Sequence, residues 1–165
     1  MRSIPLIAQR EIEANIAVAL INRYAAALGR PQAIAIARET IQNLAEDAGR
    51  QMARAWGSHS LADLAQVVRE VWAREDALDI VFIDTPRDRL AFDVHRCRYA
   101  ELYDRLGMRD MGIHLSCCRD AAFARGFNPA IQMERTRTIM EGAPSCDFRF
   151  MLTPAPLDRL MGPCT

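Results

Sequence analysis

Cysteines are the residues of this sequence best suited to chemistry. The sequence holds five, namely Cys97, Cys117, Cys118, Cys146 and Cys164. A thiolate is a strong nucleophile and a soft metal ligand, so the first four could supply a reactive or metal-binding site. Their spacing is not that of a zinc ribbon. Buried free cysteines are also ordinary core residues, so a functional cluster and a structural role both remain open.

Acidic and imidazole side chains stand near two of these thiols. Cys97 and Glu101 are four residues apart, and Cys117 and Asp120 are three apart, so each pair would share one face of a helix. His95 precedes Cys97 in the same segment. Thiol, carboxylate and imidazole groups together form nucleophile–base pairs or soft-ligand metal sites. In the alternative interpretation, the acids are solvated helix residues paired with neighbouring arginines.

Arginines gather in the same part of the chain, and they are the only basic residues apart from histidine. The cluster comprises Arg96, Arg98, Arg119, Arg135, Arg137 and Arg149. Two of them, Arg135 and Arg137, would share one face of a strand. Facing a cavity, they would bind a carboxylate through paired hydrogen bonds; facing water, they would form a solvated row. Because lysine is absent, Schiff-base chemistry on a lysine is excluded.

Three helices are expected to precede the segments that carry these residues. Apolar residues recur at helical spacing in three stripes: Ile12, Ile16, Leu20, Tyr24 and Leu28, then Ile34, Ile41, Leu44, Ala48 and Met52, then Leu61, Leu64, Val68, Val71 and Trp72. Gly29 and Pro31 separate the first two helices, and Ser60 with Asp63 predicts a capping box for the third.

Strand patterns dominate the rest of the chain. Residues 78–84 and 89–97 predict one hairpin, and residues 131–141 and 146–152 predict another. Helices are expected between the hairpins, over residues 99–106 and 111–124. The order predicts an α+β fold, with N-terminal helices packed on a small antiparallel sheet made of two hairpins with two helices between them. We expect a single domain over residues 1–165, in which residues 1–75 form a helical part and residues 78–152 carry the site.

Composition excludes several classes of protein. Hydrophobic residues make up 50% and charged residues 25% of the 165 residues, as in ordinary globular proteins. Twenty-one basic and twenty-one acidic residues cancel, so we expect neither nucleic acid nor a membrane as a partner. Charges at Arg10, Glu11 and Glu13 interrupt the start of the chain, and the number of cysteines is odd, which favours the cytoplasm. A homo-oligomer is compatible with the sequence.

Several blocks of the sequence resemble one enzyme family. They are REIEAN (10–15), RCRYAELYDRLG (96–107), LSCCRD (115–120), GFNP (126–129) and RTRTIMEGAPSCDFR (135–149). In this order they resemble the L-2-amino-thiazoline-4-carboxylic acid hydrolase family, from Ile4 to about Phe150. Members of that family usually have Cys-Asn-Arg-Asp where this chain has Cys117, Cys118, Arg119 and Asp120, so Cys118 departs from the pattern.

The resemblance implies a hydrolase that acts on a non-peptide C–N bond of a small cyclic amidine carrying a carboxylate. Water would open the ring of the namesake substrate to N-carbamoyl-cysteine. The catalytic candidates are Cys117 as nucleophile or metal ligand, with Asp120, Glu101 and His95 as acid, base or amidinium-binding groups. The candidates for substrate binding are Arg98, Arg119, Arg135, Arg137 and Asn128. A divalent metal ion such as zinc is a further alternative, with Cys97, Cys117 and Cys146 as ligands.

Two other functions compete with the hydrolase. The stretch from Glu141 and Gly142 to Cys146 and Phe148 is similar to the 4-vinyl reductase domain at the level of the fold. That likeness implies a non-catalytic sensor that binds a small ligand or a metal ion, without turnover. In the third interpretation, the chain is an interaction domain with thiols in its core. The acidic residues near the thiols favour the enzyme, because a sensor does not need an acid–base set.

Overall fold

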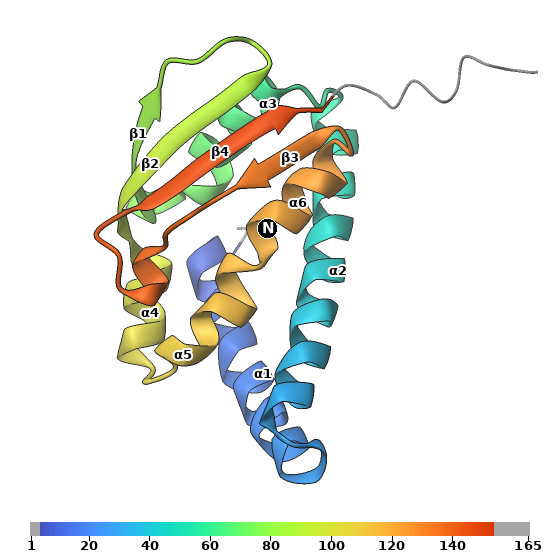
Figure 1. Cartoon of the computed structure of the whole chain (residues 1–165), viewed down its shortest axis with the longest axis vertical. Helices are drawn as coiled ribbons and strands as arrows, with labels where there is room; N and C mark the ends of the chain where they lie inside the picture. The colour runs from blue at the N-terminus through green and yellow to red at the C-terminus, as the bar shows by residue number, and fades with distance from the viewer. Residues whose placement is uncertain (1–3, 154–165) are drawn as a thin grey trace, which may run out of the picture.

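The computed structural model describes residues 4–153 of the 165-residue chain (Figure 1). In chain order its main elements are α1 (Leu6–Leu28), α2 (Arg30–Trp56), α3 (Leu61–Val67), β1 (Leu78–Ile83), β2 (Arg89–Cys97), α4 (Arg98–Arg105), α5 (Arg109–Gly112), α6 (Arg119–Phe127), β3 (Ile131–Glu134) and β4 (Cys146–Leu152). Shorter π-helical turns are η1 (Val68–Trp72) and η3 (Ile113–Cys117), and 3-10 turns are η2 (Arg74–Asp76) and η4 (Ile139–Glu141). The fifth cysteine, Cys164, lies outside the described residues.

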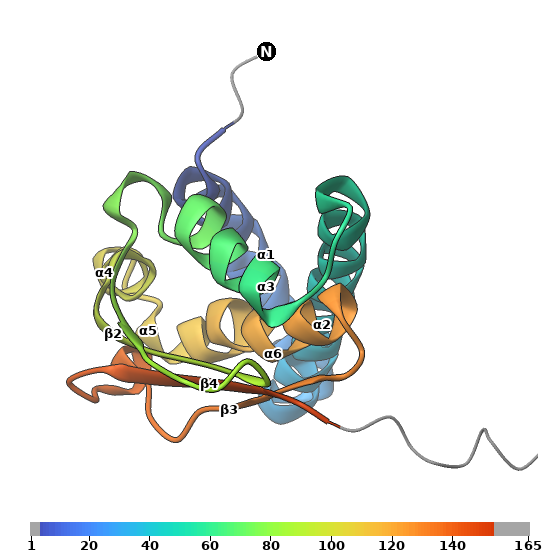
Figure 2. The same ribbon diagram turned by 90° about the horizontal axis from the view of Figure 1, so that it is seen from above.

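The four strands form one antiparallel sheet in the order β1-β2-β4-β3. Figure 2 shows α2, α3 and α6 on one face of this sheet, with α1 beyond them. A stack of aromatic rings fills the space between the layers, with the Phe92 and Phe148 ring centroids 4.8 Å apart. The structure therefore confirms the predicted α+β fold, with helices between two antiparallel strand pairs.

The boundary between the first two helices lies where the sequence predicts. Gly29 ends α1 at a φ of 86°, which a residue with a side chain adopts only with strain, and Pro31 lies in the first turn of α2. Ser60 and Asp63 form the predicted capping box of α3, with the Asp63 N–H donating to the Ser60 hydroxyl.

The predicted apolar stripe of the first helix does not face the core. Ile12, Ile16 and Leu20 are 56%, 60% and 50% exposed, whereas Val18 and Ile21 are buried. The helix carries apolar residues all round, so its sequence offers two faces that could pack. The face that packs is the one that presents small residues and Ile21 to α2 and α4.

Two predicted elements have different bounds in the structure. The helix predicted over residues 111–124 is interrupted by the π-helical turn η3, between α5 and α6. The strand predicted over residues 131–141 ends at Glu134, because the N–H groups of Thr136 and Arg137 donate to the Asp147 carboxylate and turn the chain away from the sheet. The prediction that Arg135 and Arg137 share a strand face was therefore wrong.

Helices α2 and α6 approach each other more closely than side chains would allow. A Cβ atom on Gly126 would lie 2.0 Å from the Glu46 carbonyl oxygen, and one on Gly49 would lie 2.2 Å from the Phe123 carbonyl oxygen. This contact fixes α6, which carries part of the site described below. Among the described residues, none of the helices is long and apolar enough to span a bilayer.

Candidate functional site

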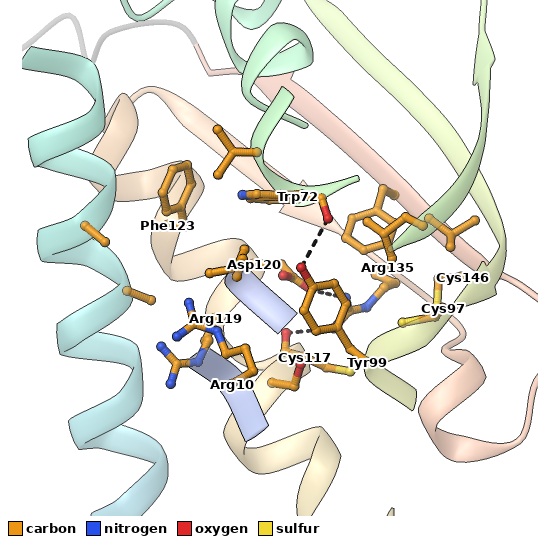
Figure 3. A pocket seen from close by; sticks show the side chains of 18 of the residues that line it. Arg10, Trp72, Cys97, Tyr99, Cys117, Arg119, Asp120, Phe123, Arg135 and Cys146 are labelled. Carbon is orange, nitrogen blue, oxygen red and sulfur yellow. Dashed lines mark hydrogen bonds and ion pairs between the residues drawn. The ribbon is translucent and has the colours of Figure 1, made fainter. Parts of the chain in front are cut away.

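A cavity of about 270 Å³ lies between the sheet and the helices (Figure 3). Its walls come from α1, α2, α4, α6, both π-helical turns, three strands and the loop after β3. The residues that line it are Leu6, Gln9, Arg10, Ala45, Ala48, Met52, Val71, Trp72, Leu78, Val94, Cys97, Tyr99, Ser116, Cys117, Arg119, Asp120, Phe123, Arg135, Cys146 and Phe148. Most of these side chains are apolar, and the polar ones come from a few positions far apart in the sequence.

An ion pair between Asp120 and Arg135 stands at the centre of the polar side chains. The Arg135 Nη1 donates to the Asp120 Oδ2 at 2.5 Å, and its Nη2 donates to the Cys117 carbonyl oxygen at 3.0 Å. The guanidinium also lies 5.0 Å from the centre of the Phe148 ring. Burial raises the pKa of the Asp120 carboxyl, while the charge and hydrogen bond of Arg135 act in the opposite direction.

Three thiols line the cavity beside this ion pair, as Figure 3 shows for Cys97, Cys117 and Cys146. Burial raises the pKa of Cys97 to about 11. Burial, together with the negative charge of Asp120, raises the pKa of Cys117 further. Burial also raises the pKa of Cys146, whose Sγ accepts the Ile139 N–H at 3.2 Å. The cavity therefore holds neutral thiols rather than thiolates at neutral pH.

The two π-helical turns place backbone carbonyl groups at the cavity. A π-helical turn shifts the hydrogen-bond pattern of a helix by one residue, and such turns are frequent at functional sites. In η3 the Cys117 carbonyl accepts from Arg135, and in η1 the Trp72 carbonyl accepts the Tyr99 hydroxyl at 3.1 Å. Burial raises the pKa of Tyr99 to about 12, so its hydroxyl remains a donor.

A second polar group joins α1 to α6. Glu13 accepts from Arg10 Nη1 at 2.5 Å and from Arg119 Nη2 at 2.8 Å, and both arginines line the cavity. Three further residues of the cavity, Arg10, Trp72 and Tyr99, were not among those predicted for the site. Two of them stood in sequence blocks that carry the family resemblance, which was the only signal that could have identified them.

The structure brings together six of the residues predicted for the site. Cys97, Cys117, Cys146, Asp120, Arg119 and Arg135 all line the cavity. Residues from the end of β2, from η3 and α6, from the loop after β3 and from the start of β4 thus meet at one place. Their roles in chemistry stay predictions.

The other predicted site residues do not line this cavity. His95 and Glu101 are exposed, and Glu101 pairs with Arg96 at 2.7 Å. Arg98 donates to the Glu75 carbonyl, and Asn128 donates to the His59 carbonyl.

Arg137 contacts different residues from those that Arg135 contacts. Its Nε donates to the Ser145 hydroxyl, and its Nη2 lies 3.7 Å from Asp93. Both partners lie outside the cavity lining, so the structure does not bring Arg137 to the site.

The geometry does not support the predicted metal site at Cys97, Cys117 and Cys146. Among residues 4–153, no group of three or more histidine, cysteine, aspartate or glutamate side chains is arranged to hold a metal ion. The physical reason is visible around the thiols. The Cys146 sulfur already accepts a backbone N–H, and the positive guanidinium of Arg135 lies beside Cys117.

Comparisons with known proteins agree with this architecture. The family model for L-2-amino-thiazoline-4-carboxylic acid hydrolase matches residues 9–150. A trafficking protein particle complex subunit 3 from Naegleria fowleri, covalently bound to palmitic acid, superposes with a TM-score of 0.55 and 11% identity, over 89% of this chain and 96% of that chain. The phenol-responsive sensory domain of the transcription activator PoxR, with phenol, superposes with a TM-score of 0.52 and 13% identity, over 92% of this chain and 76% of that chain. No curated protein sequence matches the chain. At these identities the structural likeness shows the fold alone.

Proposed function

The chain belongs to the L-2-amino-thiazoline-4-carboxylic acid hydrolase family, and from this premise we propose that it hydrolyses a small cyclic amidine that carries a carboxylate. The observation that carries the proposal is the partly buried ion pair of Asp120 and Arg135 inside a cavity of about 270 Å³. This volume is at the lower end of the range for ligand sites, so it suits a substrate with few atoms.

Asp120 is the proposed acid–base group. Only its Oδ2 is hydrogen-bonded by the described residues, so its Oδ1 remains available to a water molecule or to a substrate. Burial raises the pKa of this carboxyl above its ordinary value, which makes it a stronger base than a solvated aspartate. Arg135 keeps the carboxyl in place and opposes its full neutralisation.

The proposed reaction begins when water adds to the amidine carbon of the ring. Asp120 takes one proton from that water and passes it to the ring nitrogen as the C=N double bond is lost, so the carboxylate is regenerated. The tetrahedral carbon then forms a carbonyl group by expelling one ring atom. Loss of sulfur gives N-carbamoyl-cysteine, with the proton passing to the thiol, whereas loss of nitrogen gives the S-carbamoyl isomer. The C–N cleavage expected from the sequence corresponds to the second product, so product analysis decides which bond breaks.

Cys117 supports this reaction without acting as a preformed thiolate. Its raised pKa favours the thiol, and its carbonyl holds the Arg135 guanidinium. Trp72 and Phe123 form apolar walls that exclude bulk water and strengthen the ion pair inside.

The test compares two aspartates in the full-length protein. Asp120→Asn should lower the rate of hydrolysis of 2-amino-thiazoline-4-carboxylate by about a hundredfold or more, measured by mass spectrometry of the product. The matched control is Asp93→Asn, because Asp93 pairs with Arg149 outside the cavity. An Asp120→Asn protein that retains the parent rate, or a parent protein that leaves the substrate intact, would refute the proposal.

A single-turnover assay of Cys117→Ser separates the two routes to the product. In the water route the variant keeps most of its activity. If activity is lost and the parent protein forms a covalent adduct at Cys117, the thiol is the nucleophile and the water route is wrong.

A second candidate function is the binding of a small aromatic ligand without turnover. The observation that favours it is the largely apolar lining of the cavity, which includes Trp72, Phe123 and Phe148. In this case phenol should raise the melting temperature of the folded protein, and 2-amino-thiazoline-4-carboxylate should stay unchanged after long incubation. Hydrolysis of that substrate with no effect of phenol would remove this candidate.

A further inference from the structure

Three guanidinium groups line the cavity, and only two carboxylates pair with them. Arg10, Arg119 and Arg135 keep only 18%, 14% and 11% of their side-chain surface exposed. The acidic groups that pair with them are Glu13 and Asp120, so two negative charges face three positive ones. A buried charge without a partner is costly, and a ligand that carries one negative charge would compensate it.

The excess positive charge is centred on Arg10 and Arg119. The Arg135 guanidinium is already held by Asp120 and by the Cys117 carbonyl. By contrast, Arg10 and Arg119 share a single carboxylate, that of Glu13. Figure 3 shows the two guanidinium groups next to each other, on the side of the cavity away from Cys97 and Cys146.

The hydrogen bonds of these arginines leave donors for a ligand. Arg119 is fixed by two contacts, since its Nε donates to the Leu115 carbonyl at 2.8 Å and its Nη2 donates to Glu13. Its Nη1 has no partner among the described residues, and the same holds for the Nη2 of Arg10. Planar guanidinium groups held in this way are well suited to a carboxylate, which accepts two parallel N–H bonds.

Burial and the like charge of Arg10 also lower the pKa of Arg119. Both effects show that the environment disfavours two adjacent positive charges. A bound anion would relieve the repulsion, so this pair of arginines has more to gain from an anionic ligand than from a neutral one.

We infer that Arg10 and Arg119, held together by Glu13, form a subsite for the carboxylate group of a small ligand. For the identity of the ligand this inference rests on the proposed function, but the excess charge applies to any small carboxylate. It moves carboxylate binding from Arg135 and Arg137, where the sequence placed it, to the junction of α1 and α6. The heterocycle would then extend from this junction towards Asp120, which lines the same cavity.

The experiment measures binding rather than turnover, so that it stands apart from the hydrolase proposal. The probes are thiazolidine-4-carboxylate and thiazolidine, which share a ring, lack the amidine and differ in the carboxylate. In calorimetry with the full-length protein, the carboxylate should bind at least about tenfold more tightly than thiazolidine. Arg10→Gln and Arg119→Gln should each weaken carboxylate binding by about ten- to a hundredfold and leave thiazolidine binding nearly unchanged.

Arg125→Gln is the matched control, because Arg125 lies on α6, is exposed and pairs with Glu46 outside the cavity lining. It should bind both probes like the parent. Equal affinity of the parent for the two probes, no binding of either probe, or full binding by the arginine variants would overturn the inference. If circular dichroism shows that Arg119→Gln does not fold, the affinity of Arg10→Gln for thiazolidine-4-carboxylate alone decides whether the subsite exists. A protein that binds the carboxylate through these arginines but does not hydrolyse 2-amino-thiazoline-4-carboxylate would refute the hydrolase and keep the subsite.

Discussion

Burial has the largest influence on the pKa of each cysteine within residues 4–153. Cys97 and Cys117 stand close to carboxylate and guanidinium groups, yet loss of contact with water is the largest influence on both thiols. Cys118 stands where the family usually has asparagine. It behaves like the other two thiols, because burial raises its pKa to about 11. Its sulfur lies 2.8 Å from the His114 carbonyl oxygen. The second thiol of the Cys-Cys pair is thus engaged with its own helix and does not line the cavity.

These pKa values predict slow alkylation of the folded protein. In a Cys164→Ser background, iodoacetamide at neutral pH should label Cys97 about a hundredfold more slowly than in urea, because the unfolded thiol titrates near its ordinary value of about 8.5. Mass spectrometry of the labelled peptides measures each site. Rapid labelling of Cys117 in the folded state would show that it exists as a thiolate and would restore it as a nucleophile.

Individual site residues were predictable to a limited extent. Asp120 and Cys117 could be paired from their spacing, because three residues on a helix place two side chains on one face. Arg10 could not be paired with Arg119 in this way, since more than a hundred residues separate them and only the packing of α1 against the other helices brings them together. Glu101 has the same type of spacing as Asp120, but its helix turns it to solvent.

At the scale of elements, α1 shows why an apolar pattern can be misread. Its residues with four-residue spacing suggest one packed stripe, but a second set at Ala14, Val18 and Ile21 is the one that is buried. Periodicity locates faces and cannot choose between two apolar ones. That choice depends on which face fits α2 and α4.

Two adjacent residues of α1 test this assignment. Ile21 is 3% exposed and Leu20 is 50% exposed. Ile21→Ala should lower the free energy of unfolding by about 2–4 kcal/mol, since it leaves a cavity in the core. Leu20→Ala should change it by no more than about 0.5 kcal/mol. Urea unfolding of both variants measures the difference, and a comparable cost for Leu20→Ala would mean that this face is packed.

The loop after β3 depends on a single carboxylate. Asp147 accepts the N–H groups of Thr136 and Arg137 and the Thr136 hydroxyl, the last at 2.6 Å. Burial would raise the pKa of Asp147, but these hydrogen bonds outweigh burial and lower it below the ordinary value. The position of Arg135 at the cavity therefore depends on the hydrogen bonds that the neighbouring loop residues donate to Asp147.

The lowered pKa predicts loss of stability in acid. The unfolded carboxyl binds a proton at about pH 4, before the folded one does, so the stabilisation is complete above that range and disappears as the pH falls through the folded pKa. Asp147→Asn should lower the free energy of unfolding by about 1–3 kcal/mol at neutral pH. The amide NH2 of the asparagine would replace one carboxylate oxygen and would face N–H donors of the loop instead of accepting from them. In urea unfolding at several pH values, the free energy of unfolding should fall less steeply with decreasing pH in the variant than in the parent. An equally steep fall in both proteins would mean that Asp147 does not cause the loss of stability in acid.

At the scale of the whole molecule, the contact between α2 and α6 holds the helical layer together. The backbones touch at Gly49 and Gly126, where no room remains for a Cβ atom. The sequence predicted α2 and the order of elements from its turn signals and its periodicity. The sequence could not predict this close approach, because a glycine inside a helix does not indicate which other helix packs against it.

Gly126→Ala should separate the two helices. The new Cβ would lie 2.0 Å from the Glu46 carbonyl oxygen, and a backbone atom cannot give way as a side chain can. We expect a loss of about 3 kcal/mol or more in the free energy of unfolding. Gly107→Ala is the control, since its Cβ meets open space and its φ of 67° costs only about 1 kcal/mol. Thermal unfolding followed by circular dichroism compares the two, and equal melting temperatures would contradict the close contact.

The outward face of α1 has a practical consequence for anyone who purifies this protein. The folded chain has an exposed hydrophobic ridge, formed by Ile12, Ile16, Leu20 and Tyr24. Such a ridge retains a protein on phenyl resin and takes up naphthalene-sulfonate dyes, whose fluorescence ordinarily signals loosened packing. Dye fluorescence will therefore report the native surface here, and near-ultraviolet dichroism is the better criterion of an intact core.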